Sequence, residues 1–470
     1  MVAIAEVLSP EVEAFLRRRA GVSPAQVQGT IVQRIVRSKW TWVALGVILT
    51  AVISTTILLV DIMADRKAEN GSKIPGLNAD ALWSSAVRAW PTLLFWIVCF
   101  ILVDRYKPQR LLVWFLALIW GGAIAIPASY YLNTWVGEQM AVIDAMSGVA
   151  AIRVAVFVAP FVEEATKACI IFLIVVVDRN RFSSRVSGAV VGGLAGAGFA
   201  FTENIVYYAR AIVFGSYTGS AGDVAAAVDE LVFMRGVLTC FGHPLFTLFT
   251  GVGVAFAVAS RSKIVRILAP SAGFLMAAFL HMFFNWQVSV IPTEQVIFMI
   301  LILAWPIVIG VAIRVIISSV KQGRTLAARL RGYVIVGWIP SNYPSAFSKL
   351  HRRAWTLFMS LWHGSVIRTW ILQQRVTELA MLSEAITRGT VDYGGLSREY
   401  DLINEIQLIT ATGGIADARG YRPYWPWQAK KYRGLVKKPR DRYAIPGAAQ
   451  GATIAPLKYS AVDPRWTPPT

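Results

Sequence analysis

Long apolar segments recur along this chain and restrict its fold more than any other feature. Each is about 20 residues long, enough for an α-helix to cross the ~30 Å hydrocarbon core of a bilayer. Hydrophobic residues make up 56% of the sequence and charged residues 16%, against roughly 25% charged residues in soluble domains. The sequence therefore predicts an all-α, polytopic membrane bundle of about eight transmembrane helices. The expected spans are residues 41–62, 87–104, 111–132, 149–177, 186–212, 231–259, 266–289 and 295–318.

Lys and Arg residues are unevenly distributed between these spans, and their distribution predicts the topology. The connections 105–110, 178–185 and 261–266 each carry three basic residues, whereas 133–148 and 213–230 carry acidic residues and no Lys or Arg. Basic connections are retained on the cytoplasmic side of a membrane. We therefore expect a multi-pass protein whose two termini are both cytoplasmic.

Changes in composition divide the chain into four expected regions. They are a cytoplasmic N-terminal arm (1–40), a transmembrane domain (41–319, with its motif core at 150–290), a cytoplasmic, basic, amphipathic helical region (320–412) and a Pro-, Trp- and Arg-rich tail (413–470) that we expect to be extended or disordered. Apolar spacing predicts surface helices at 366–388 and 396–411. Trp and Tyr beside Lys and Arg are typical of a membrane interface, so we expect this basic C-terminal part to contact anionic lipid headgroups. No nucleic-acid partner is expected.

Ionisable residues occur in the middle of four consecutive spans. An ionisable side chain at membrane depth costs several kcal/mol unless it is paired or hydrated, so it indicates a functional site. The groups, in chain order, are Glu163, Glu164 and Lys167; Glu203 and Asn204; His243; and His281 and Asn285.

Spacing and depth place these groups in one volume. Lys167 follows Glu163 by four residues and Glu164 by three, and Asn285 follows His281 by four, so each set shares one helix face. At 1.5 Å per residue, the groups lie roughly 18–25 Å from the ends of their spans. The Glu164–Lys167 pair has a purely structural reading as an ion pair. For Glu163 and Glu203 the sequence shows no further basic partner.

The chemistry that these residue types allow is hydrolysis. Two imidazoles and a carboxylate can bind zinc and leave a position for water, and a further glutamate can transfer protons. Peptide hydrolysis within the bilayer is therefore the predicted function. The alternative is a transporter or proton-conducting channel, which also places carboxylates and imidazoles at the midplane. Transporters commonly have repeated halves, whereas these groups have no counterpart in the first three spans.

The motifs EExxK (163–167), GFxxxEN (198–204), GHxxFT (242–247) and HxxxN (281–285) together resemble the PrsW family of intramembrane proteases. That family is related to the CAAX prenyl endopeptidases and to membrane proteases that process bacteriocins. The resemblance covers residues 150–290. It implies a bacterial cytoplasmic membrane protein that cleaves a membrane-anchored substrate, typically an anti-sigma factor.

The resemblance also implies roles for single residues. Glu163 is expected to activate water, beside Glu164, with Lys167 and Asn204 in support. Glu203, His243 and His281 are expected to bind a metal, zinc, or the water, and Asn285 to stabilise the oxyanion. The prenyl endopeptidases have a histidine at the position of Glu203, so both a metal-dependent and a metal-free glutamic mechanism are compatible with the motifs.

Overall fold

The computed structural model describes residues 31–67, 71, 73–104, 106, 109–143, 151–178, 185–218, 224–260, 262–387 and 393–419. The chain divides into two compact units. Here the large unit comprises the described residues of 31–104 and 109–315, and the C-terminal unit comprises Tyr106, 316–387 and 393–419. The expected N-terminal arm up to residue 30, and the tail from residue 420, lie outside the described residues.

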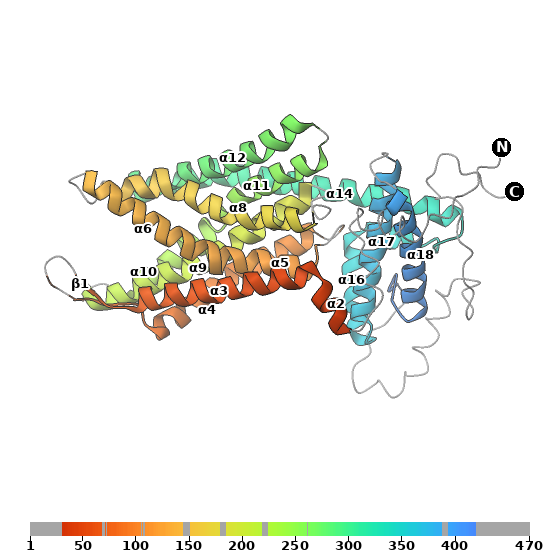
Figure 1. Cartoon of the computed structure of the whole chain (residues 1–470), viewed down its shortest axis with the longest axis horizontal. Helices are drawn as coiled ribbons and strands as arrows, with labels where there is room; N and C mark the ends of the chain where they lie inside the picture. Colours follow the sequence, from red (N-terminus) through yellow and green to blue (C-terminus); the bar gives the residue numbers. More distant parts are fainter. Residues whose placement is uncertain are drawn as a thin grey trace. The chain divides into compact units, whose positions relative to one another are not determined.

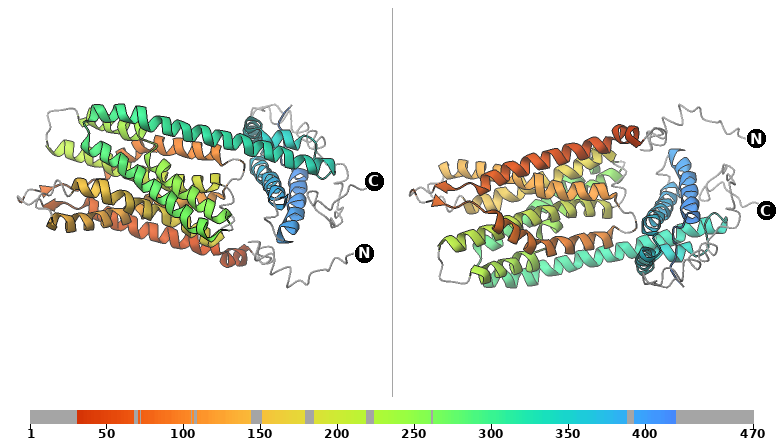
Figure 2. Two further views of the ribbon diagram at one scale, coloured as in Figure 1. Left: turned by 90° about the horizontal axis from the view of Figure 1, so that it is seen from above. Right: turned by 90° about the horizontal axis from the view of Figure 1, so that it is seen from below.

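The large unit is a bundle of long helices that run side by side (Figures 1 and 2). Its described elements are α2 (Ile31–Arg37), α3 (Lys39–Met63), β1 (Arg66–Lys67), β2 (Lys73–Ile74), α4 (Ala79–Val103), α5 (Leu111–Ile119), η2 (Trp120–Ala125), α6 (Ile126–Ile143), η3 (Val154–Val158), α8 (Ala159–Asp178), α9 (Arg185–Thr218), α10 (Val224–Phe233), η5 (Met234–Leu238), α11 (Gly242–Ala259), α12 (Lys263–Val290), α13 (Thr293–Met299), η6 (Ile300–Ala304) and the first part of α14 (Trp305–Ile335). The η elements are π-helical turns within longer helices. The two short strands form an antiparallel hairpin.

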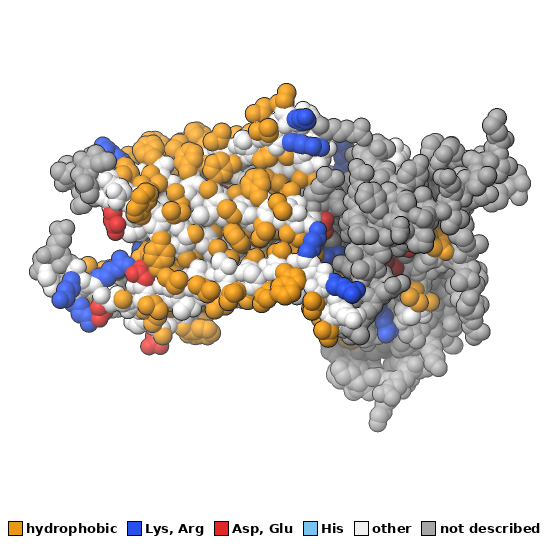
Figure 3. Space-filling view, in the orientation of Figure 1, with side chains coloured by type: hydrophobic (Ala, Val, Ile, Leu, Met, Phe, Trp, Pro, Cys, Tyr) orange, Lys and Arg blue, Asp and Glu red, His pale blue; other side chains and the backbone are white. Residues whose placement is uncertain are grey.

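The apolar surface of this bundle agrees with a membrane protein. Among the described residues, seven helices are long and apolar enough to cross a membrane. Hydrophobic side chains cover the middle of the bundle, while charged side chains gather towards its ends (Figure 3). The expected span at 149–177 is helical from η3 through α8, but it carries Glu163, Glu164 and Lys167 and is not among the seven. The all-α polytopic class is therefore confirmed.

Helix α9 lies at the centre of the bundle, where it packs against α11 on one side and α4 and η2 on others. Its glycines allow this close packing: a Cβ atom at Gly192 would lie 2.5 Å from the carbonyl oxygen of Thr247, and one at Gly196 would lie 2.3 Å from that of His243. Small residues allow helix backbones to approach closely in membranes. The glycine positions thus set the distance between the two helices that carry Glu203 and His243.

The C-terminal unit is a separate helical bundle with its own core. Its described helices are the last part of α14, α15 (Tyr343–Ser348), α16 (Leu350–Trp362), α17 (Val366–Thr387) and α18 (Tyr393–Ala411). Leu326, Tyr343, Leu379 and Ile406 are among the fully buried residues of this core. The helices predicted at 366–388 and 396–411 correspond to α17 and α18. They were expected at the surface, but Leu379 of α17 and Ile406 of α18 lie in the buried core of this unit.

Candidate active site

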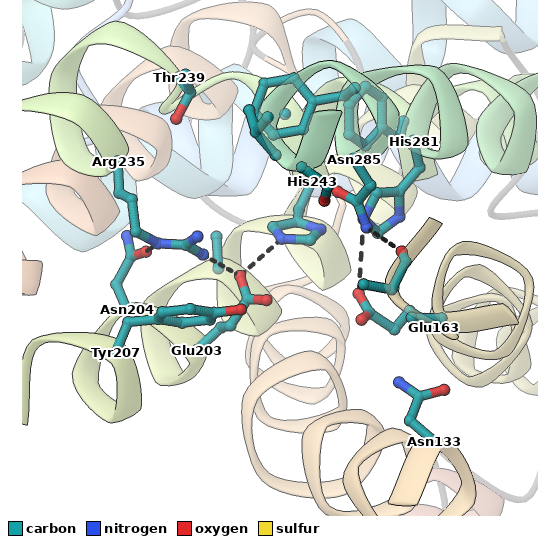
Figure 4. A pocket seen from close by; sticks show the side chains of 18 of the residues that line it. Asn133, Glu163, Glu203, Asn204, Tyr207, Arg235, Thr239, His243, His281 and Asn285 are labelled. Carbon is teal, nitrogen blue, oxygen red and sulfur yellow. Dashed lines mark hydrogen bonds and ion pairs between the residues drawn. The ribbon is translucent and has the colours of Figure 1, made fainter. Parts of the chain in front are cut away.

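Four helices, α8, α9, α11 and α12, bring the polar residues predicted from the sequence to one cavity (Figure 4). The cavity has a volume of about 520 Å³. Six of the predicted site residues line it: Glu163, Glu203, Asn204, His243, His281 and Asn285. Glu164 and Lys167 are fully buried beside it. The structure therefore brings together all eight residues that the sequence singles out.

Lys167 is the centre of the buried charge cluster. Its Nζ atom lies 2.9 Å from Glu164 Oε1 and 3.4 Å from Glu163 Oε2, both one helical turn away. The same atom lies 2.9 Å from His243 Nδ1 and 3.7 Å from the centre of the Phe199 ring. Because a buried ammonium needs such partners, Lys167 fixes the side chains on α8 relative to α11.

Glu164 has a structural position rather than a place on the cavity wall. One of its oxygens, Oε2, accepts a hydrogen bond from Thr247 Oγ1 at 2.8 Å. The other, Oε1, lies 3.3 Å from His281 Nδ1. A carboxylate can only accept, so this contact puts a proton on Nδ1 of His281, and in the neutral imidazole Nε2 is then the acceptor. Such a carboxylate–histidine pair is the usual support behind a metal-binding or catalytic imidazole.

Glu203 and His243 form a second chain of contacts across the cavity (Figure 4). Glu203 Oε2 lies 2.8 Å from His243 Nε2 and 2.5 Å from Arg235 Nη2. Arg235 Nε in turn donates to Asn204 Oδ1 at 2.8 Å. Because a lysine ammonium can only donate, His243 accepts from Lys167 through Nδ1 and donates to Glu203 through Nε2. Both ring nitrogens of His243 thus have hydrogen-bond partners in this arrangement, and His243 would have to give up one of these contacts in order to bind a metal.

Arg235 corrects the sequence-based expectation that Glu203 has no basic partner. It comes from the π-helical turn η5, between α10 and α11, and also lies 3.9 Å above the ring of Tyr207. The signal was present in the sequence, since an arginine inside the predicted span 231–259 is itself expected to have a partner. Which acid it would reach could not be read from spacing, because the two residues lie on different helices.

Glu163, His243 and His281 together could hold a metal ion. One ligand atom from each lies within 4.8 Å of the other two, and His281 Nε2 is 3.8 Å from Glu163 Oε2. Two imidazoles and one carboxylate are a donor set found at catalytic zinc sites, so the residues fit the group. This set contains Glu163 where the sequence-based expectation had Glu203, whose carboxylate instead contacts Arg235 and His243.

The charge of the cluster also fits a cation. With neutral imidazoles, the three carboxylates of Glu163, Glu164 and Glu203 outnumber the two cations of Lys167 and Arg235 by one. A divalent ion together with a hydroxide would leave the cluster neutral. Burying a net charge in a membrane is costly. The excess negative charge can be removed by a bound cation, by a positively charged substrate group or by protonation of one carboxylate.

Two asparagines add polar groups to the cavity wall. Asn285 donates one hydrogen of its amide to the carbonyl oxygen of Ala155 at 2.8 Å, which leaves the second hydrogen for another acceptor. Asn133, on α6, lines the cavity near Glu163 (Figure 4). Its buried Oδ1 atom has no hydrogen-bond partner among the described residues. Asn133 was not predicted from the sequence, because it precedes the motif-bearing spans.

This fold and this site together define the class of the protein: a multi-pass membrane protein with an internal site of carboxylates and imidazoles. A comparison with protein-family models identifies the family. Residues 107–311 match the PrsW family intramembrane metalloprotease model, so this part of the chain is a PrsW-family domain and the protein is an intramembrane protease. The match includes all four helices that carry the motifs, while residues 1–106 and 312–470 lie outside it.

No curated protein and no solved structure matches the chain. The family match confirms the resemblance inferred from the four motifs and does not favour the transporter alternative. The family's description as metalloproteases agrees with the Glu163, His243 and His281 cluster.

Proposed function

We propose that this protein hydrolyses a peptide bond of a membrane-anchored substrate inside the cavity, with Glu163 as the group that activates water. The observation that carries the proposal is the convergence of Glu163, Glu203, His243 and His281 in one cavity of about 520 Å³ within a helical membrane bundle. An anti-sigma factor is the substrate class that the family resemblance suggests. We further propose that the protein lies in the cell membrane with both termini in the cytoplasm.

Glu163 is assigned the proton transfers because it is the least committed carboxylate of the three. It faces the cavity, and its closest charged partner is Lys167 at 3.4 Å. Glu164 is held by Lys167, Thr247 and His281, and Glu203 by Arg235 and His243. A carboxylate that is held less tightly by cations takes a proton from water more readily and can later deliver it to the leaving amine.

The other residues position the reactants. Glu203, held by Arg235, orients His243, and Glu164 orients His281, so that both imidazoles face the cavity. The free amide hydrogen of Asn285 is the proposed donor to the oxyanion. Asn204 supports this arrangement through Arg235. Lys167 holds the acidic side chains and His243 in place.

A zinc ion would be held by Glu163, His243 and His281. When bound, it would supply Lewis-acid polarisation of the water and of the substrate carbonyl. In that version Glu163 would be a ligand of the ion as well as the residue that accepts the proton of the water. In the metal-free version the same residue acts alone as base. Both versions require Glu163, and metal analysis of the purified protein distinguishes them.

The uncharged polar side chains in the cavity lining suit a substrate whose helix has unwound. A transmembrane helix satisfies all its backbone groups internally, so cleavage requires local unwinding, and the freed groups then need new partners. The Oδ1 atom of Asn133, which has no hydrogen-bond partner in the described part of the chain, is the proposed acceptor for one substrate N–H group. The basic tail, residues 413–470, is proposed to contact anionic lipid headgroups; most of it lies outside the described residues.

The test compares membrane proteins and their new N-termini in cells that carry the wild-type chain or Glu163→Gln. We expect the substrate to accumulate uncut in the variant, with the variant protein present in the membrane at normal amount. Glu138→Gln is the matched control, since Glu138 is exposed on α6 and does not line the cavity. Cleavage that continues unchanged in Glu163→Gln would refute the proposed role of Glu163.

A further inference from the structure

Helix α16 in the C-terminal unit has one buried face and one exposed apolar face. Arg353, Thr356, Met359 and Ser360 are buried and face the interior of the unit. On the other side, Trp355, Phe358 and Leu361 are 49%, 45% and 56% exposed. Large apolar side chains that are half exposed at successive helical turns are unusual on a protein surface without a partner.

Three aromatic rings follow one another on this side of α16, with Trp362 partly exposed at the end. The ring centres of Trp355 and Phe358 are 5.7 Å apart, and those of Phe358 and Trp362 are 4.5 Å apart. We call Trp355, Phe358, Leu361 and Trp362 the α16 aromatic face. Trp in particular favours the headgroup level of a bilayer, where its apolar ring and its polar N–H are both satisfied.

Cations, and no acids, accompany this face. The sequence from 349 to 374 contains Lys349, Arg352, Arg353 and Arg368 and no Asp or Glu. Arg353 points inward and donates to Thr377 at 3.0 Å, whereas Lys349 and Arg368 are exposed. An apolar face flanked by cations is the pattern of helices that lie in the interface of an anionic membrane.

The C-terminal unit follows a candidate membrane span in the chain. The apolar helical segment Thr293–Ile335 is that span, and the C-terminal unit begins at residue 316 within its helix α14. The chain therefore tethers the C-terminal unit covalently to the membrane-spanning part.

We propose that the α16 aromatic face docks into the headgroup region of an anionic lipid surface. The positive charge of the surrounding residues favours an anionic lipid surface over a neutral or cationic one. The aromatic side chains favour the headgroup region of the bilayer over bulk water. This contact does not depend on the proposed proteolytic activity. A second copy of the chain, or the chain's own residues 420–470, would be alternative occupants of the same face.

The test uses the full-length protein reconstituted in vesicles. Cys99, Cys169 and Cys240 are replaced by Ala, and Phe358→Cys carries an environment-sensitive fluorophore. Ala411→Cys, an exposed position on α18 outside this face, carries the same fluorophore as control. Vesicles contain either phosphatidylcholine alone or a mixture with phosphatidylglycerol, with a quencher attached to the lipid near the headgroup.

We expect the lipid quencher to reduce emission at position 358 about threefold more than at position 411 in the anionic vesicles. High salt or neutral lipid should decrease this difference. Equal quenching at both positions in anionic vesicles would overturn the proposal. So would a fluorophore at 358 that both aqueous iodide and the lipid quencher fail to reach, because protein then covers the face. If the fluorophore at 358 becomes accessible to these quenchers only when the protein is diluted in the vesicles, the face is covered by a second copy of the chain, and the proposal is also overturned.

Discussion

Replacing Lys167 by Met tests whether the buried charge cluster is held together by this one ammonium. The Nζ atom lies 2.9 Å from Glu164 and 3.4 Å from Glu163. At an effective dielectric constant of about 20, unit charges at these distances attract by about 6 and about 5 kcal/mol. The cost of burying the ammonium offsets part of this attraction. Removing one partner of a buried ion pair nevertheless destabilises proteins by about 3–5 kcal/mol, since the other charge is left uncompensated.

We therefore expect Lys167→Met to lower the free energy of unfolding by about 3–5 kcal/mol and to abolish cleavage. The double variant Glu164→Gln/Lys167→Met removes one negative and one positive charge. It should be more stable than the sum of the single effects by about 2 kcal/mol, as expected for directly contacting residues. Unfolding is followed by circular dichroism in mixed micelles with increasing denaturing detergent.

Lys263→Met serves as the control, because Lys263 is exposed at the start of α12 and its replacement should change stability by less than about 0.5 kcal/mol. Lys167 does not hold the cluster together if Lys167→Met costs less than about 1 kcal/mol, a value typical of exposed ion pairs. The same conclusion follows if the effects of the two substitutions simply add, because Lys167 and Glu164 would then not be coupled.

Further predictions concern helix packing, the second contact chain and the metal. Gly196→Ala should destabilise the protein by about 1–3 kcal/mol and reduce cleavage, because the added Cβ would lie 2.3 Å from the carbonyl oxygen of His243. In a thermal unfolding assay the control Gly46→Ala should behave like the wild type, because its added Cβ would have no atom within 4 Å. Arg235→Gln should reduce the cleavage rate about 100-fold, since Glu203 loses its charged partner and an uncompensated buried charge costs several kcal/mol. Arg210→Gln, at an exposed position, is the control, and equal cleavage rates for the two variants would exclude Arg235 from the site. If zinc is bound, elemental analysis of the purified protein should find about one ion per chain, lost in His281→Ala; activity that survives in protein free of metal would exclude the zinc version and leave the glutamic one.

The helical class and eight polar residues in or beside the cavity were indicated by the sequence itself, whereas Arg235 and Asn133 were not. Both indications rest on local properties. An apolar run of about 20 residues must be helical in a bilayer, because its backbone groups have no other partners. An ionisable residue in such a run signals a site by its solvation cost. The motifs around Glu163, Glu203, His243 and His281 therefore suffice to indicate an intramembrane protease.

The tertiary structure alone decided which of these groups meet. Spacing places Glu163 and Glu164 on neighbouring positions of one helix, but helix rotation determines that Glu163 faces the cavity while Glu164 is buried against Thr247 and His281. The pairing of Glu203 with Arg235 joins helix α9 to the π-helical turn η5. Such contacts join residues about 30 or more positions apart. They are set by packing between helices, which no local pattern encodes.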